Sequence, residues 1–432
     1  MPRTIKTLAP QLPKLAPNND NYIKKSYDIT VVTPLFGGGV EAGKVDTKHP
    51  IRETSIRGQL RFWWRATVGQ RYETPEKLAE AESELWGSTE KASKVRVKVT
   101  KTDKLSYRNH DKNYNFDQNS PKLYALFSAK QNKNNIAKEG FTFNLEIALE
   151  KRINIDSPQD APDQHKKNSE DILKALKAWV NFGGIGARTR RGCGALYCRE
   201  LSPSENEDIL AWLKTNFGEY LNSKKTRPWP TMAHTIIAKK SNPMENIQAW
   251  ENVISLYKSF RQGKHFRRNE GQERNNPEHS RWPEPDSIRK IATALKSNPT
   301  DIDKLVVSAA FGLPIVTKFK DKGDPEETTL YPIYKKEQKE RMASSLILKP
   351  LAISYHKGIP IVVQLRAPLP ETLKIEGEKE ISYSVPIPDA NVPHQATKYH
   401  NSPMGADCFN SGKALEAFIS YMKENEFAEV EA

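Results

Sequence analysis

Cysteines, long apolar runs and a secretion signal are scarce or missing in this sequence of 432 residues. It holds only three cysteines, and none has the CxxC or Cys/His spacing of a zinc site, so we expect reduced thiols. No run of about 18 apolar residues indicates a membrane span, and prolines interrupt the first twenty residues, which lack the apolar core of a signal peptide. We therefore expect a soluble, cytoplasmic protein without membrane contact, and neither a metal ion nor a cofactor.

Positive charge is abundant by contrast. Lysine and arginine number 67 against 53 acidic residues, which gives a net charge of +14. Such an excess favours association with polyanions, and nucleic acid is the commonest soluble one. Many basic proteins bind no anion, however, so the placement of the basic residues matters more than their number.

The pattern of apolar residues predicts the order β-α-β-β-α-β in the first half of the chain. Strands are expected at 26–36, 94–101, 141–149 and 195–199. Helices are expected at 55–68 and 169–182, with Ser55 and Ser169 as N-caps, and an additional helix is expected at 76–86. This is the order of ferredoxin-like, or RNA-recognition-motif, domains, which belong to the α+β class.

The length of the chain indicates about two domains. Strands and helices mix again in the second half, which predicts a second ferredoxin-like domain with a strand at 231–239 and helices at 243–260 and 412–422. Polar insertions are expected at 102–121 and 262–285. The expected organisation is a flexible arm (1–25), the first domain (26–200), a linker (201–228), the second domain (229–424) and a frayed acidic tail (425–432).

The segment 53–72, ETSIRGQLRFWWRATVGQRY, combines two adjacent tryptophans with a series of arginines. On a helix, Arg57, Arg61 and Arg65 form a stripe beside the apolar side, and no acidic residue follows them within the segment. We interpret the tryptophans as anchors and the arginines as contacts to an anion, which Gly58 would allow close to the helix start. The alternative is that the arginines cover apolar surface and pair with distant acids.

The glycine-rich stretch GGIGARTRRGCG is expected to bind phosphate. Glycines let the backbone curl so that N–H groups converge on an anion, and arginines add bidentate contacts or stack on bases. The stretch is neither a Walker A loop nor a dinucleotide-binding fingerprint. The residues concerned are Gly183, Gly184, Gly186, Arg188, Arg190, Arg191, Gly192 and Gly194.

A third basic stretch, KSFRQGKHFRR at 258–268, interleaves basic residues with aromatic ones. This composition suits single-stranded nucleic acid, because charge follows the phosphates while rings stack on bases. A solvated loop is an equally common reading of such a run. The expected contacts are Lys264, Arg267 and Arg268.

Six stretches together resemble one known family. In chain order they read TPLFGGG, ETSIRGQLRFWWRA, GGIGARTRRGCGAL, HSRWPEPDSIR, AAFGLPIVTKF and RMASSLILKPLAI, and they extend from residue 33 to residue 353. They are similar to subunit one of the Cmr complex, a RAMP-superfamily subunit of type III-B CRISPR–Cas effectors. The resemblance implies two ferredoxin-like domains in tandem.

The resemblance also implies a function, namely RNA binding within an RNA-guided, RNA-targeting ribonucleoprotein of antiviral defence. The implied partners are the guide RNA (crRNA) and single-stranded target RNA near the 3′ end of the guide, and neighbouring RAMP subunits of the Cmr complex. In this family, target cleavage belongs to a different subunit. The matching stretches add four basic residues to the expected RNA contacts, namely Arg281, Lys318, Arg341 and Lys349.

The alternatives are an endoribonuclease and a scaffold that binds only protein. Asp46 and His49 lie in a loop after the first strand, and related RAMP nucleases carry a catalytic aspartate in a comparable loop. Asp46 could act as a base on a 2′-hydroxyl, with His49 assisting near neutral pH. An Asp–x–x–His pair in a polar loop is more often simply solvated, so a non-catalytic role is predicted. A scaffold whose basic patches meet acidic subunits would show no RNA affinity alone.

Overall fold

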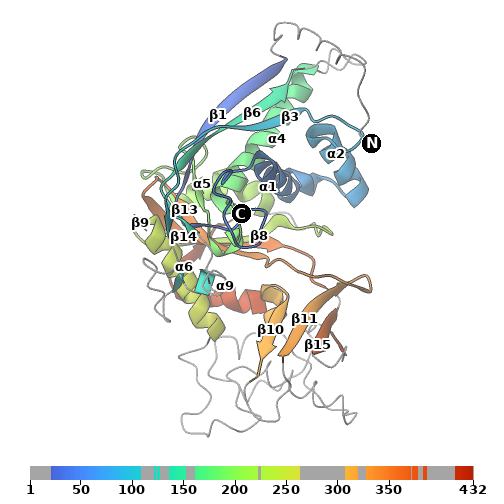
Figure 1. Cartoon of the computed structure of the whole chain (residues 1–432), viewed down its shortest axis with the longest axis vertical. Helices are drawn as coiled ribbons and strands as arrows, with labels where there is room; N and C mark the ends of the chain where they lie inside the picture. The colour runs from blue at the N-terminus through green and yellow to red at the C-terminus, as the bar shows by residue number, and fades with distance from the viewer. Residues whose placement is uncertain are drawn as a thin grey trace, which may run out of the picture.

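Two larger sheets and their helices alternate along the length of the molecule. In Figure 1 the order from top to bottom is the first sheet, its helices, the second sheet and a further pair of helices. The computed structural model describes residues 21–108, 121–122, 124–126, 136–151, 161–221, 225–262, 307–319, 327–370, 372–377, 383–386 and 414–431. Within these ranges, no helix is both long enough and apolar enough to cross a lipid bilayer.

The first sheet has the spatial order β3-β6-β1-β7, and all neighbouring strands are antiparallel. Helices α1 and α4 cover one of its faces, and α2 packs on α1. In chain order the elements are β1 (Tyr22–Val31), α1 (Glu53–Ala66), α2 (Pro75–Trp86), β3 (Val95–Thr102), β6 (Thr142–Glu150), α4 (Ala161–Phe182) and β7 (Leu196–Tyr197). Strands and helices thus occur near the predicted positions in this half, with α2 as the additional helix and with three further short strands between them.

The second sheet has the spatial order β13-β14-β8-β17, again with antiparallel neighbours. Helices α6 and α9 lie on one face. The elements are β8 (Thr231–Lys239), α6 (Asn246–Gln262), β13 (Leu346–Ala352), β14 (Lys357–Arg366), α9 (Ala414–Glu424) and β17 (Phe427–Glu429). Both sheets thus share one arrangement. The second strand in chain order lies at one edge, followed across the sheet by the third, the first and the fourth.

Smaller elements surround these layers. A third sheet joins β10 (Ile315–Lys318), β11 (Glu327–Tyr334), β15 (Thr372–Gly377) and β16 (Tyr383–Pro386), with β12 (Glu337–Gln338) beside β11. A fourth joins β2 (Leu35–Phe36), β5 (Ile136–Ala137) and β4 (Tyr107–Arg108), while β9 (Met244–Glu245) pairs with β14. Helix α5 (Ile209–Leu221) and three short 3-10 helices complete the described elements, namely η1 (Val68–Arg71), η3 (Thr189–Arg191) and η4 (Val307–Phe311).

The second sheet is buried on both faces. Side chains such as Ile237 and Leu348 pack with α6 and α9, while their neighbours Ile236 and Ile347 face the helices of the first half. Strand β13 is buried along its whole length as a result. The helices of the first half therefore serve two sheets, because α1 and α4 contact the first sheet on one side and the second sheet on the other.

Several expected boundaries are wrong. The N-cap of α1 is Arg52, whose carbonyl accepts the N–H of Ile56 at 3.1 Å, and Ser55 lies inside the helix. Helix α4 begins at Ala161 instead of Ser169, because the polar residues before the predicted cap continue the helix. The stretch expected as a linker, 201–228, contains α5, whose Leu213 and Phe217 are buried against the core.

The acidic tail is also ordered. Residues of β17 pair with β8, and this strand completes the second sheet. Phe427 and Val430 are each only 4% exposed, so apolar burial holds a segment whose charge predicted fraying. Much of the expected arm (1–20), the polar insertion (109–120) and most of the third basic stretch (263–268) lie outside the described residues.

Candidate nucleic-acid interface

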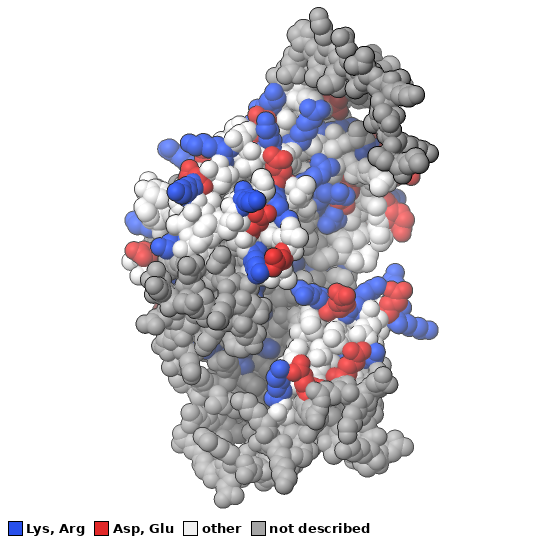
Figure 2. Space-filling view, viewed as in Figure 1, with Lys and Arg blue, Asp and Glu red and all other residues white. Residues whose placement is uncertain are grey.

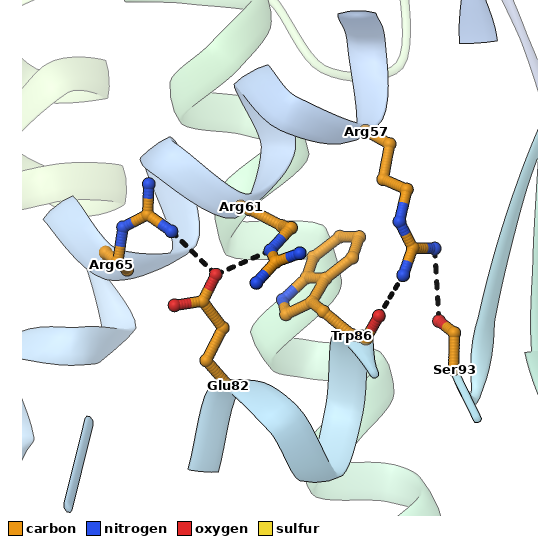
Figure 3. Close-up of polar contacts among 6 residues, drawn as sticks. All are labelled: Arg57, Arg61, Arg65, Glu82, Trp86 and Ser93. Carbon is orange, nitrogen blue, oxygen red and sulfur yellow. Dashed lines mark hydrogen bonds and ion pairs between the residues drawn. The ribbon is translucent and has the colours of Figure 1, made fainter. Parts of the chain in front are cut away.

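The arginine stripe of α1 faces α2 (Figure 3). The Arg61 Nε and the Arg65 Nη1 both lie 2.6 Å from the Oε1 of Glu82, whose side chain is only 9% exposed. Arg57 donates to the carbonyl oxygens of Trp86 and Val95, the latter at 3.1 Å. The alternative given above therefore holds for these side chains, because an acid from the next helix and backbone oxygens engage all three guanidinium groups.

The tryptophans of α1 are anchors, as predicted. Trp63 is 2% exposed and Trp64 is 1% exposed, and both belong to the core between the two large sheets. Gly58 lies on the exposed side of the first turn, where a Cβ would meet no atom within 4 Å. The helix thus separates its apolar and basic sides as expected, but the arginines of the basic side already bind groups of the protein itself.

The glycine-rich loop directs its N–H groups at the protein itself. Ile185 donates to Gly194 at 3.0 Å, and Gly194 donates to the carbonyl oxygen of Pro34 at 2.9 Å. Ala187 likewise donates to the carbonyl oxygen of Phe36 at 2.6 Å. These three N–H groups are not available to phosphate, which corrects the expectation of a phosphate nest for them.

Close packing explains why glycine occurs in this loop. Gly192 has φ +77°, and a Cβ there would lie 2.6 Å from Cδ1 of Trp250 and 2.7 Å from the carbonyl oxygen of Leu348. The loop therefore touches α6 and β13 of the second half directly. Gly183, Gly184, Gly192 and Gly194 are buried, and Gly186 is exposed.

Two of the loop arginines cross from the first half to the second. Arg191 donates to the hydroxyl of Tyr257 at 2.9 Å, and its guanidinium lies 4.2 Å from the centre of that ring. Arg190 donates to the carbonyl oxygen of Ser344, and partial burial lowers its pKa to about 10. Arg188 is exposed and donates to the carbonyl oxygen of Ala125 at 3.1 Å. Only Arg188 of the three thus presents an exposed side chain.

Lys349 is a buried structural residue. It lies in the middle of β13 with 0% exposure, and its Nζ donates to the carbonyl oxygens of Gly183 at 2.8 Å and Val180 at 3.2 Å. These oxygens are at the C-terminal end of α4, where carbonyl groups lack helical partners and attract a cation. Burial lowers the pKa of Lys349 to about 7. Because the side chain of Lys349 is fully buried, it cannot make the expected contact with RNA.

The other predicted contacts are scattered. Lys318 is exposed on β10 and lies 2.7 Å from the Oε2 of Glu327. Arg341 is exposed between β12 and β13. Lys264, Arg267, Arg268 and Arg281 lie outside the described residues. Of the described residues of the predicted set, Gly58, Gly186, Arg188, Lys318 and Arg341 are exposed.

Asp46 closes a turn in an exposed loop. Its Oδ1 accepts the N–H groups of Lys48 at 2.9 Å and His49 at 3.0 Å. These hydrogen bonds lower the pKa of Asp46, with smaller contributions from the charges of His49 and Arg52. A lowered pKa weakens a carboxylate as a general base near neutral pH.

A basic surface that the sequence reasoning missed lies on the face of the first sheet opposite α1 and α4. Arg96, Lys98 and Lys101 are exposed along β3, and Lys24 is exposed on β1. Figure 2 shows basic side chains on the upper part of the molecule, where Figure 1 places these strands, with acidic side chains among them. The sequence feature that could have revealed this surface is the alternation of valine and basic residues in VRVKVTK. It was interpreted only as a half-exposed strand.

Two neighbouring hollows follow this open face. One, of about 860 Å³, extends around the edge strand β3, from Tyr22, Arg96 and Lys98 on the open face to Glu53 and Arg57 of α1. The other, of about 600 Å³, is lined by residues that include Lys101 and Tyr355. The register places Lys98 opposite Glu146 and Lys101 opposite Asn144, so the two hollows occupy adjacent rows of the same sheet.

The first half of the chain is similar to a known class of proteins. The family model of the RAMP superfamily matches residues 28–197, which contain the first sheet, its helices and the glycine-rich loop. The match covers less than half of the chain, so it shows similarity of this half to the RAMP superfamily.

Among curated proteins, the chain is similar to two Cmr1 subunits. It is 30% identical over 169 residues to CRISPR system Cmr subunit Cmr1-1 of Pyrococcus furiosus, over 37% of this chain and 44% of that one. It is 26% identical over 190 residues to Cmr1-2 of the same organism, over 39% of this chain and 92% of that one. The match therefore spans less than half the length of Cmr1-1.

Solved structures give weaker similarities. The crystal structure of apo Cmr1 from Pyrococcus furiosus is matched with a TM-score of 0.48 and 16% identity, over 94% of this chain and 98% of that one. A chain in the cryo-EM structure of the type III-B Cmr-beta complex bound to cognate target RNA is matched with a TM-score of 0.43 and 15% identity. That match covers 93% of this chain and all of the other.

Proposed function

We propose that the chain is a non-catalytic, RNA-binding subunit of an RNA-guided, RNA-targeting Cmr effector complex in the cytoplasm. In this proposal it contacts guide and target RNA near the 3′ end of the guide, beside neighbouring RAMP subunits. The observation that carries the proposal is the RAMP match together with the similarity to two Cmr1 subunits. The net charge of +14 supports a polyanionic partner.

We further propose that each half of the chain is a ferredoxin-like domain, the first at 26–200 and the second from 229 past the expected end at 424, so that it includes β17. Both halves have the chain order strand, helix, strand, strand, helix, strand, once insertions are set aside. Both also have the same spatial order of strands, which is that of a split βαβ arrangement. The insertions then include α2 in the first half and the sheet around β11 in the second.

Not all of the predicted RNA contacts remain in the proposal. We retain the positions that the structure leaves exposed, namely Gly58, Gly186, Arg188, Lys318 and Arg341. An exposed ion pair such as that of Lys318 is weak and exchanges with solvent, so it does not prevent binding to a phosphate.

A ribonuclease activity of the chain itself receives less support. RNA cleavage through a 2′-hydroxyl needs a base whose pKa is near the working pH. The pKa of Asp46 is lowered instead, and its carboxylate already accepts two backbone N–H groups. We therefore assign Asp46 to the turn and not to catalysis.

Affinity purification of the tagged chain from its own cells tests the proposed function. Mass spectrometry and RNA sequencing are expected to find further Cmr subunits and guide-type RNA in the purified material. An untagged strain serves as the control for non-specific RNA. Recovery of the chain without RNA and without other RAMP proteins would contradict the proposal.

A further inference from the structure

We infer that the open face of the first sheet is a trough for single-stranded RNA, with the ribose-phosphate backbone along β3. This inference rests on the proposed function and names the surface that performs it. The basic side chains of this face are concentrated on the edge strand β3, where Arg96, Lys98 and Lys101 are exposed and no acidic residue lies among them. Strand β3 is at the end of the sheet order, so these groups form one rim of the trough.

The rim is available for an external anion. Arg96 lies over the ring of Tyr22, with 3.9 Å between the guanidinium carbon and the ring centre. Lys98 and Lys101 have no acidic partner within ion-pair distance among the residues that the structure describes. Side chains two residues apart on one strand face are separated by about 7 Å, close to the spacing of successive phosphates in an extended strand.

The centre of the same face differs from the rim. Asp28, Asn144 and Glu146 occupy the inner strands β1 and β6, directly beside the basic rim. Asn144 donates to the Oδ1 of Asp28 at 2.9 Å, which holds this pair in place. Carboxylates repel phosphates but accept hydrogen bonds from the amino groups of bases, so this arrangement favours a backbone on β3 and bases over the inner strands.

The second half of the chain contributes an aromatic group to the far end of the trough. Tyr355, in the turn between β13 and β14, is 60% exposed and lines the second hollow together with Tyr197 and Arg199. Its ring lies 3.8 Å from the ring of His356, centre to centre. An exposed aromatic ring beside a basic groove is the usual platform for a nucleotide base in sequence-independent binding.

The surface properties of the two sheets support this assignment. In the second sheet, the face turned towards α1, α4 and α5 carries apolar side chains such as Ile236 and Ile361. The equivalent open face of the first sheet carries Lys24, Glu146 and Lys98. Its polar character excludes an apolar helix as the occupant, whereas the one-sided positive rim suits a single nucleic-acid strand.

Binding of the full chain to labelled single-stranded RNA across a salt series tests the inference. The Arg96→Gln/Lys98→Gln/Lys101→Gln variant is expected to bind at least tenfold more weakly than wild type. Its slope of log affinity against log salt should fall by about 2, since each lost phosphate contact removes about 0.7. The control is Lys77→Gln/Lys214→Gln/Lys423→Gln, which changes net charge equally at exposed positions away from this face.

A second pair of variants tests the aromatic platform. Tyr355→Ala is expected to weaken binding about fivefold or more, because loss of one base stack costs this much, while Tyr355→Phe should retain wild-type affinity. Equal affinities of the rim and control variants would overturn the trough and leave RNA binding elsewhere intact. A wild-type chain that binds polyglutamate but no RNA would overturn both the trough and the proposed RNA-binding function.

Discussion

Replacement of Lys349 by methionine is expected to change the pH dependence of stability. The amine lies in the core with two carbonyl oxygens as partners, and its pKa is lowered from an ordinary value of 10.5 to about 7. Between these pH values the unfolded chain binds a proton that the folded chain does not, so folding becomes more favourable as pH rises. Below about pH 7 the lysine is charged in both states, and the full penalty of its burial applies.

The magnitude follows from the size of the shift. Each pKa unit corresponds to about 1.4 kcal/mol, so the shift of Lys349 amounts to about 5 kcal/mol over its full range. Between pH 7 and pH 9 the wild-type free energy of unfolding should gain about 2–3 kcal/mol from this group alone. Lys349→Met has a similar chain length, removes the titration and leaves two carbonyl oxygens at the C-terminal end of α4 without their donor. At pH 6 the variant gains stability because it buries no charge, and it loses stability because two hydrogen bonds are missing. We therefore expect the stabilities of wild type and variant to lie within about 2 kcal/mol of each other at this pH.

Urea unfolding followed by tryptophan fluorescence at pH 6, 7, 8 and 9 measures this difference. The free energy of unfolding of wild type minus that of Lys349→Met should increase steadily above pH 7. Lys239→Met is the control, because Lys239 lies in the same sheet but reaches solvent, with 16% of its side chain exposed, and approaches Glu426 at 4.0 Å. If the wild-type and Lys349→Met curves remain parallel from pH 7 to pH 9, the reasoning about this buried amine is refuted.

Two pairs of variants and one activity assay give further expected outcomes. Glu82→Gln should lower stability by about 2 kcal/mol, because a mostly buried carboxylate with two arginine partners is lost, whereas the exposed Glu84→Gln should cost less than about 1 kcal/mol in the same urea assay. Gly192→Ala should cost more than about 3 kcal/mol or prevent folding, since the methyl group meets two close neighbours at positive φ. In contrast, Gly58→Ala should raise stability by about 0.5–1 kcal/mol. Labelled RNA should stay intact with purified protein, and cleavage that disappears in Asp46→Ala would restore the ribonuclease hypothesis.

Local sequence patterns were sufficient to predict the framework of the fold. The strand predicted at 231–239 has the same bounds as β8, and the helix predicted at 76–86 differs from α2 by one residue. Both signals are periodicities within one segment, which the sequence displays directly. The burial of Trp63 and Trp64 was predicted in the same way, from their position on one side of α1.

Partners that are distant in sequence explain the failures at the site. The arginine stripe of α1 was correctly spaced, but its acidic partner, Glu82, comes from the following helix. The glycine-rich loop has the composition of a phosphate site, yet Gly192 is required by its contact with Trp250 in the other half. Lys349 lies in the apolar run LILKPLA, which indicates a buried position. Its hydrogen-bond acceptors at the end of α4, however, are about 170 residues earlier in the chain.

Helices α1 and α4 pack against both large sheets, and this arrangement limits the number of layers in the molecule. Each pair of helices covers the sheet of its own half, and the first pair also seals the sheet of the other half, so neither half could be cut away without exposing a wide apolar face to water. A third unit of the same design would need an apolar sheet on which to seat its helices. The open face of the first sheet carries charged and hydroxyl-bearing side chains instead. No further unit can therefore pack on this face, which resembles the polar outer face of a capping repeat.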